Sequence, residues 1–191
     1  MSEFDRQKWD EKYRLGPSDA VAAVPQWLAE HLAWLPSGRA IDVACGLGGA
    51  AISLADNGWT VAAVDVSSVG LARAASAAGH RSVLVDWIAA DLDNFEFPFQ
   101  AYDVITMFNY LDRGRLPGQI VRTLRPGGML VAETFSVEQL GRPDNHIKNP
   151  DHVLGRGELL TMFAGLRVRC YRDVMLPDRS VASLIAEKPR G

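Results

Sequence analysis

The sequence is poor in cysteine, in long apolar runs and in charge of one sign, and each shortage argues against a class of protein. Two cysteines, Cys45 and Cys170, occur among 191 residues, so there is no disulfide framework. No uninterrupted apolar stretch approaches the roughly 20 residues of a transmembrane helix, and the first residues show no signal-peptide pattern. We therefore expect a protein of the reducing cytoplasm without a membrane partner.

The charge balance argues against a polyanionic partner. The chain has 20 Lys and Arg residues against 23 Asp and Glu residues, which gives a formal net charge of -3. Proteins that neutralise many phosphates usually carry a basic face, and no segment here is basic over more than a residue or two. We therefore expect no nucleic-acid partner, and the oligomeric state, monomer or dimer, is left open.

The chain alternates between strand-like and helix-like segments. Apolar runs rich in β-branched residues predict strands at residues 40–43, 60–64, 82–85, 102–107, 129–132, 166–170 and 181–186. Helical spacing predicts helices between most of them, and Ser67 is placed to cap one. The last two strands are too close for a helical crossover and should pair as an antiparallel hairpin. The pattern predicts an α/β fold, a doubly wound, Rossmann-like, mostly parallel seven-stranded sheet with an antiparallel last strand and helices on both faces.

A glycine-rich segment follows the first predicted strand and leads into a helix. Residues 41–51 read IDVACGLGGAA, and small residues there allow a tight turn and a close approach of the backbone to a ligand. Gly46, Gly48 and Ala51 also satisfy the dinucleotide pattern G-x-G-x-x-G/A. From this segment alone, a dinucleotide, another nucleoside cofactor and a turn without any ligand all remain open.

Three acidic residues stand in or just after the first three predicted strands. Asp65 follows Gly46 by about 20 residues, where a carboxylate can bind ribose hydroxyls or cap the next helix. Asp91 can accept a hydrogen bond from an adenine amino group, or its carboxylate can do no more than stabilise the turn that contains it. Asp42 lies inside the first strand, where an acid is costly without a partner. It can stabilise loop amides, take an ammonium group through water or be purely structural.

These segments resemble the successive motifs of the class I S-adenosylmethionine-dependent methyltransferases. The resemblance runs in order through the glycine-rich segment, Asp65, Asp91-Leu92, residues 102–105 and residues 124–128. It extends to the last predicted strand, so it covers nearly the whole chain. One departure is Ala44, which stands where the family usually has its first glycine.

Within that family the chain is most similar to the small tellurite-resistance and thiopurine-type enzymes. The similar segments are residues 9–14 (WDEKYR), 111–113 (LDR), 149–151 (NPD) and 157–160 (GELL). The resemblance implies a single methyltransferase domain over residues 1–191. Residues 1–37 would form N-terminal lid and cap helices, and residues 38–191 the cofactor-binding core.

The resemblance also implies a cofactor, S-adenosyl-L-methionine, and roles for individual residues. Asp65 would hold the ribose, Asp91 and Leu92 the adenine, Gly46 and Gly48 the methionine part, and Phe108 the sulfonium end. On the lid helix, Arg14 could pair with the cofactor carboxylate, while Trp9 could close over the cofactor or anchor the helix on the core. The implied cofactor-binding residues are Arg14, Asp42, Gly46, Gly48, Asp65, Val66, Asp91, Leu92 and Phe108.

The sequence names no firm catalytic residue. Methyl transfer from a sulfonium has a neutral leaving group, so alignment and water exclusion can supply much of the rate, and a base is needed only for a protonated acceptor. His146, in a polar loop after the fifth strand, is a weak candidate base, and Arg142 or Arg156 could bind an anionic acceptor. A solvated loop without a role is the favoured interpretation of all three residues. No metal-site spacing occurs.

Three functions remain in competition. The favoured one is a methyltransferase that acts on a small molecule such as a thiol or an oxyanion. A nicotinamide-dependent oxidoreductase fits the glycine pattern but leaves Asp42 and Asp91 without a role. A regulator that binds the cofactor without turnover would share every cofactor-binding residue.

Overall fold

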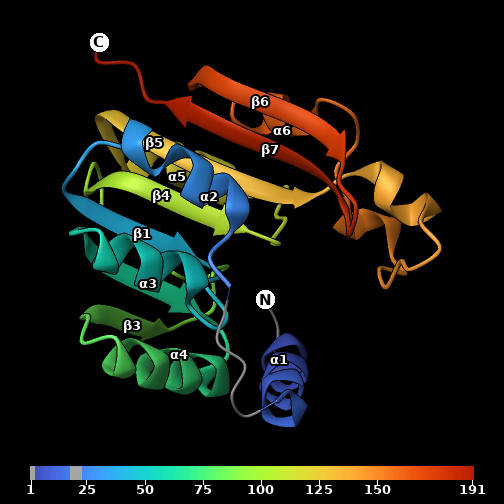
Figure 1. Ribbon diagram of the computed structural model, residues 1–191. Coiled ribbons are helices and arrows are strands. Elements are labelled where there is room, and N and C mark those ends of the chain that lie inside the picture. The colour runs from blue at the N-terminus through green and yellow to red at the C-terminus, as the bar shows by residue number, and fades with distance from the viewer. Residues whose placement is uncertain (1–2, 18–22) are drawn as a thin grey trace.

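The computed structural model describes residues 3–17 and 23–191, which form one seven-stranded sheet with helices on both faces (Figure 1). The sheet order is β3-β2-β1-β4-β5-β7-β6. Strands β1 to β5 are parallel, and β7 is antiparallel to both β5 and β6. The strands are β1 Arg39–Val43, β2 Thr60–Asp65, β3 Val85–Ala89, β4 Tyr102–Phe108, β5 Leu124–Phe135, β6 Arg167–Met175 and β7 Ser180–Glu187. This arrangement confirms the predicted fold class.

The helices cover the sheet in two layers, each with its own apolar core. Helices α2 and α3 pack on one face, where Trp27, Leu28 and Leu54 are buried, and α5 and α6 pack on the other, where Ile120 and Phe163 are buried (Figure 1). The helices are α1 Glu3–Leu15, α2 Gln26–His31, α3 Gly49–Asp56, α4 Ser68–His80, α5 Leu116–Thr123 and α6 Glu158–Met162. Short 3-10 helices are η1 Leu32–Trp34, η2 Val137–Gly141 and η3 Pro150–His152.

The third strand lies later in the chain than the prediction of residues 82–85. The residues directly after α4 are still hydrogen-bonded to its last turn. Ser82 has φ +57°, and its amide donates to the Gly79 carbonyl, while the Val83 amide donates to the Ala78 carbonyl. Leu84 is 91% exposed, so its apolar character marks no strand. The strand begins only at Val85, where pairing with Val61 of β2 starts.

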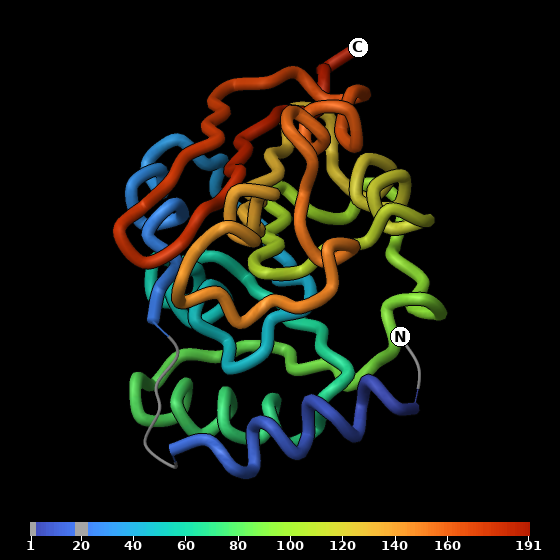
Figure 2. Tube along the Cα trace, turned by 90° about the vertical axis from the view of Figure 1, so that its right-hand side faces the viewer, coloured from blue at the N-terminus to red at the C-terminus, as the bar shows by residue number. Residues whose placement is uncertain are grey.

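The first strand marks the point where the strand order reverses. Strand β1 has β2 on one side and β4 on the other, and the chain leaves it at the carboxyl edge of the sheet. Helix α1 lies at this edge beside α4, far from it in sequence (Figures 1 and 2). Ligands of doubly wound sheets bind at such a reversal. The functional site is therefore expected between the end of β1 and α1.

Within residues 3–17 and 23–191, no helix combines the length and apolarity that crossing a bilayer requires.

Candidate functional site

The glycine-rich segment forms a tight loop between β1 and α3. Ala44, Gly46 and Gly48 all have positive φ, at +55°, +54° and +77°. A side chain has no room at either glycine: a Cβ would lie 2.6 Å from the Tyr13 hydroxyl at Gly46 and 2.6 Å from the Trp87 ring at Gly48. Glycine is therefore required at both positions, whereas Ala44 holds a strained conformation for an L-residue.

Asp65 ends β2 directly beside this loop. Its carboxylate accepts hydrogen bonds from the Gly46 amide at 2.8 Å and from the Ser67 amide at 2.9 Å. Burial raises the pKa of Asp65, although both amides favour its charged form. Helix α4 is capped by Ser67, whose side chain accepts from the Gly70 amide, so Asp65 is not the cap. Each carboxylate oxygen keeps a lone pair for a further donor such as a hydroxyl.

Asp42 lies beneath the loop and is fully buried within β1. Its carboxylate accepts from the Ala51 amide in the first turn of α3 at 3.1 Å and from the Thr106 hydroxyl of β4 at 2.7 Å. Burial raises the pKa of Asp42 to about 7, opposed by these two hydrogen bonds. The two bonds tie β1, β4 and α3 together, so Asp42 supports the loop from behind.

The remaining predicted cofactor residues follow β2, β3 and β4 at the same edge of the sheet. Asp91 accepts from the Asp93 amide at 2.9 Å and the Asn94 side chain at 3.1 Å, which closes the turn after β3. Leu92 is buried in the core under α5 and α6, and Val66 is buried next to Asp65. Phe108, half-buried at the end of β4, packs against the opposite core.

Helix α1 is bonded to α4 and places an aromatic pair at the loop. Asp10, buried, accepts from the Ser67 hydroxyl at 2.6 Å and the Val69 amide at 3.2 Å. Tyr13 stacks on Trp9, with ring centroids 5.8 Å apart, and lies over Gly46 and Gly70. Burial raises the pKa of Tyr13, with the charge of Asp65 adding to it.

The other residues of α1 divide between anchoring and exposure. The Arg73 guanidinium donates to the Tyr13 carbonyl at the end of α1. Arg14 is exposed on the same helix. The sequence analysis assigned no role to Asp10 or Tyr13; the spacing of Trp9 and Tyr13, four residues apart, was the signal that could have identified Tyr13.

The structure places the weak candidate residues for the acceptor on the loop after β5. His146 is exposed and meets the Phe135 ring edge to face at 5.5 Å. Arg142 donates to the Leu176 and Pro177 carbonyls, and Arg156 pairs with Glu138. Both guanidinium groups thus already have protein partners. Among residues 3–17 and 23–191, no group of three or more His, Cys, Asp or Glu side chains is arranged to hold a metal ion.

Three segments that carried the resemblance meet at Arg113. Its guanidinium pairs with Glu158 of α6 and donates to the carbonyls of Asp151 at 2.6 Å and Val153 at 2.8 Å. Residues 111–113, 149–151 and 157–160 are therefore neighbours in space, although about 45 residues separate the first from the last.

A family model described as a methyltransferase domain matches residues 40–128. The ubiquinone biosynthesis O-methyltransferase of Burkholderia pseudomallei (strain 1710b) is 30% identical over 143 residues, which cover 71% of this chain and 61% of that protein. The demethylmenaquinone methyltransferase of Renibacterium salmoninarum is 30% identical over 127 residues, 64% of this chain and 47% of the relative. The chain thus spans half to three-fifths of these relatives.

Solved structures extend the similarity beyond the matched domain. A Methanosarcina mazei protein solved as a SAM-dependent methyltransferase superposes with a TM-score of 0.69 at 18% identity, covering 89% of this chain and all of that one. At 18% identity this similarity shows the fold alone. Residues 40–128, which match the methyltransferase domain model, therefore lie within a Rossmann-like fold that the Methanosarcina mazei protein also has.

Proposed function

We propose that the protein transfers the methyl group of S-adenosyl-L-methionine to a small molecule. The observation that carries this proposal is the hydrogen bond from the Gly46 amide to Asp65. It puts a buried carboxylate next to a loop in which Gly46 and Gly48 have no room for a side chain. A ribose needs such a carboxylate, and an approaching cofactor needs such a bare backbone. The cofactor would supply the electrophilic methyl group, and the protein would supply binding, alignment and exclusion of water.

The residues at the edge of the sheet fit the parts of this cofactor. We assign the ribose hydroxyls to Asp65, the adenine to Asp91 and Leu92, and the methionine part to Gly46 and Gly48. Val66 would line the nucleoside, Phe108 the sulfonium, and Arg14 would pair with the carboxylate. Asp42 acts through the loop that it supports, so it is a positioning residue.

The acceptor is proposed to be a small molecule rather than a nucleic acid. The net charge of -3 and the names of the two relatives, which act in ubiquinone and menaquinone chemistry, favour this assignment. The similarity of residues 9–14 and 111–113 to tellurite-resistance and thiopurine-type enzymes keeps a thiol or an oxyanion as a further possibility. His146 stays a candidate base for an acceptor that arrives protonated.

Thermal unfolding with added ligands tests the proposal. S-adenosylhomocysteine should raise the melting temperature, because a ligand of the folded state stabilises it, while NAD should leave it unchanged. The reverse result would favour a nicotinamide-dependent oxidoreductase. Release of S-adenosylhomocysteine from S-adenosylmethionine with thiols, catechols and oxyanions then separates an enzyme from a regulator that binds without turnover.

A further inference from the structure

We propose that Lys8 and Lys12 of α1 bind a negatively charged group of the methyl acceptor, so that the acceptor is a small amphipathic anion such as an aromatic carboxylate. This inference rests on the proposed function, because it assigns the substrate class of the same site. It makes the lid helix a determinant of acceptor specificity as well as a cover for the cofactor.

The two lysines lack acidic partners, although the chain as a whole is acidic. Among the described residues, no carboxylate lies within 4.0 Å of either ammonium group, whereas Arg6 on the same helix pairs with Glu3 and Asp10. Like charges four residues apart destabilise a helix by about 0.2–0.5 kcal/mol. A bound anion would turn this repulsion into attraction, since both ammonium groups could contact it.

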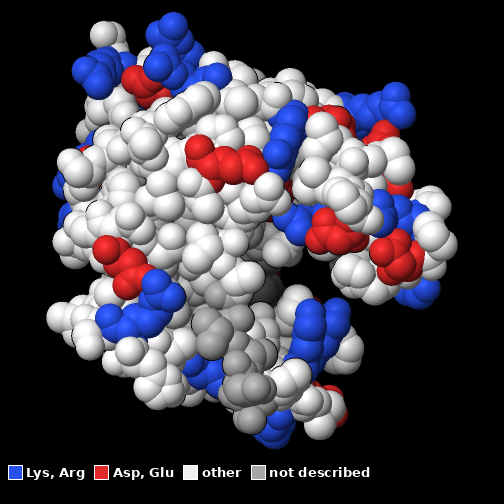
Figure 3. Space-filling view, viewed as in Figure 1, with Lys and Arg blue, Asp and Glu red and all other residues white. Residues whose placement is uncertain are grey.

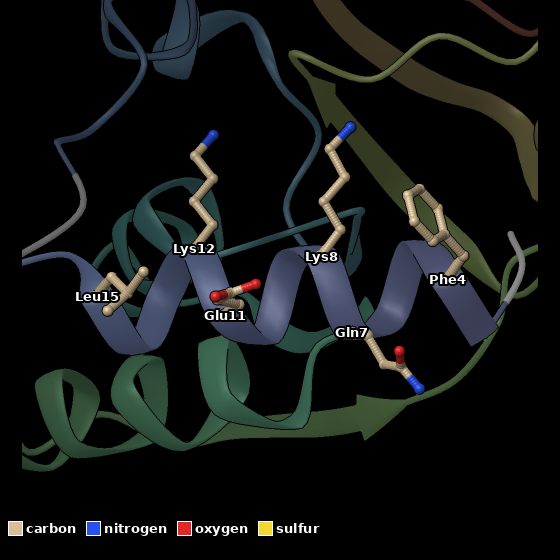
Figure 4. Close-up of a pocket in the computed structure, with 6 residues that line it drawn as sticks. All are labelled: Phe4, Gln7, Lys8, Glu11, Lys12 and Leu15. Atoms are coloured by element: carbon tan, nitrogen blue, oxygen red, sulfur yellow. The ribbon is translucent and has the colours of Figure 1, made fainter.

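The lysines belong to a face of α1 that is suited to an amphipathic ligand. Both side chains extend from α1 on the side away from α4, with Phe4 next in the same row (Figure 4). Phe4 is 73% exposed and Leu15 77% exposed, so apolar surface flanks the charged pair. Together with Gln7 and Glu11 these residues line a shallow hollow of about 430 Å³, within the volume range of small-molecule sites.

This face stands at the rim of the hollow in front of the strand ends. Figure 3 shows the molecule hollowed between α1 below and the segment after β5 above, with Lys and Arg side chains gathered on the lower side. An acceptor entering there would pass the lysine pair on its way to the glycine loop.

A continuous series of ring contacts links the lysine pair to the glycine loop. The Lys12 ammonium lies 4.2 Å from the centre of the Trp9 ring, Trp9 stacks on Tyr13, and the Tyr13 hydroxyl lies over Gly46. The rings of Trp9 and Tyr13 therefore lie between the Lys12 ammonium group and the glycine loop. An aromatic acceptor could place its reacting atom near the loop and its anionic group on the lysines, with stacking on an aromatic face adding affinity.

Lys12 has a positive neighbour and an exposed side chain. Desolvation lowers the pKa of Lys12, and the nearby positive charge of Lys8 lowers it further. An ion pair at such an exposed position contributes at most about 1 kcal/mol, so both lysines are needed for an appreciable effect on anion binding.

Binding of a matched pair of fluorescent probes tests this assignment on the full chain with S-adenosylhomocysteine present. The anionic probe is 8-anilinonaphthalene-1-sulfonate, and the neutral one is N-phenyl-1-naphthylamine. The double variant Lys8→Gln/Lys12→Gln should weaken the sulfonate by about tenfold, the scale of losing two partly exposed ion pairs. It should leave the neutral probe unchanged. The control Arg167→Gln/Arg169→Gln removes two charges from β6, at the far edge of the sheet, and should affect neither probe.

The outcomes separate this inference from the proposed function. Equal loss of both probes, equal weakening by the β6 control, or no sulfonate binding to the unaltered protein would overturn the role of the lysines. Failure of S-adenosylhomocysteine to bind the unaltered protein would instead overturn the proposed function. In the double variant its affinity should stay unchanged, because neither lysine is assigned to the cofactor. For turnover, KM for 3,4-dihydroxybenzoate should rise about tenfold while KM for catechol stays the same.

Discussion

The carboxylate of Asp10 lies 2.6 Å from the hydroxyl of Ser67, and this contact joins helix α1 to the N-cap of α4. Asp10 also accepts from the Val69 amide, so a negative charge sits at the positive end of the α4 dipole. The Ser67 hydrogen bond, with help from Val69 and Arg6, outweighs burial and lowers the pKa of Asp10. The position of Tyr13 over the glycine loop therefore depends on a contact about one helical turn away along α1.

Replacing Asp10 should loosen the attachment of α1 to α4. Asp10→Ala removes a charged acceptor from the buried Ser67 hydroxyl and the part-buried Val69 amide, so the free energy of unfolding should fall by about 1–3 kcal/mol. Affinity for S-adenosylhomocysteine should fall as well, because the aromatic pair loses its anchor. Urea unfolding and calorimetry measure the two effects. Glu11→Ala, an exposed change on the same helix, should alter neither; an equal effect would show that α1 responds to any substitution.

The backbone at Ala44 predicts a stabilising substitution. Its φ of +55° lies in the left-handed region, which costs an L-residue about 1–2 kcal/mol, while glycine loses only about 0.5–1 kcal/mol in chain entropy. Ala44→Gly should therefore raise the free energy of unfolding by about 0.5–1 kcal/mol, measured by urea unfolding. Ala50→Gly, inside α3, should lower it by about the same amount. A destabilised Ala44→Gly variant would mean that packing of the Ala44 methyl group stabilises the fold by more than the backbone strain at this residue costs.

Residue patterns predicted most of the fold, because most of its elements have local causes. The runs of β-branched residues mark six of the seven strands, and Ser67 caps α4 as its position predicted. The third strand was misplaced because Val83 and Leu84 are apolar, yet the Val83 amide still donates to Ala78 of α4 and Leu84 is exposed. Periodicity cannot distinguish an apolar residue left exposed, such as Leu84, from one in a strand.

The candidate site was predictable only where one segment defines it. The glycine loop and the place of Asp65 at the end of β2 follow from short motifs. The partners of Asp42 and Asp10 could not be predicted: Thr106 is 64 residues from Asp42, and Ser67 is 57 residues from Asp10. Such contacts depend on strand order and helix docking, which a pattern of residues does not encode.

Asp65 should be the most sensitive residue for cofactor binding. Asp65→Ala should weaken S-adenosylhomocysteine binding by about 1–3 kcal/mol, the scale of a lost hydrogen bond to a charged group. It also leaves the Gly46 and Ser67 amides without their acceptor, so stability should fall too. Asp65→Asn keeps one acceptor oxygen and should lose less of both. Calorimetry at equal fractions folded checks the result, and unchanged affinity would remove Asp65 from the site.

The buried carboxyl group of Asp42 should make stability fall as pH rises from about 4 to about 7. Burial raises its pKa from 3.8 in the unfolded chain to about 7 in the folded protein. Between these values the folded state therefore holds more protons than the unfolded state. Each pH unit in this window then lowers the free energy of unfolding by at most about 1.4 kcal/mol.

Substitution at Asp42 isolates this contribution from that of Asp65, whose raised pKa acts in the same direction. In Asp42→Asn, the amide oxygen can still accept from the Ala51 amide and the NH₂ group can donate to Thr106, without a charge to bury. Urea unfolding between pH 5 and pH 8 should show a smaller slope for this variant than for the unaltered protein. At pH 8 the variant should equal or exceed it in stability. Thr106→Val removes a donor that favours the carboxylate, so it should extend the fall to higher pH; parallel curves for all three proteins would contradict a titrating Asp42.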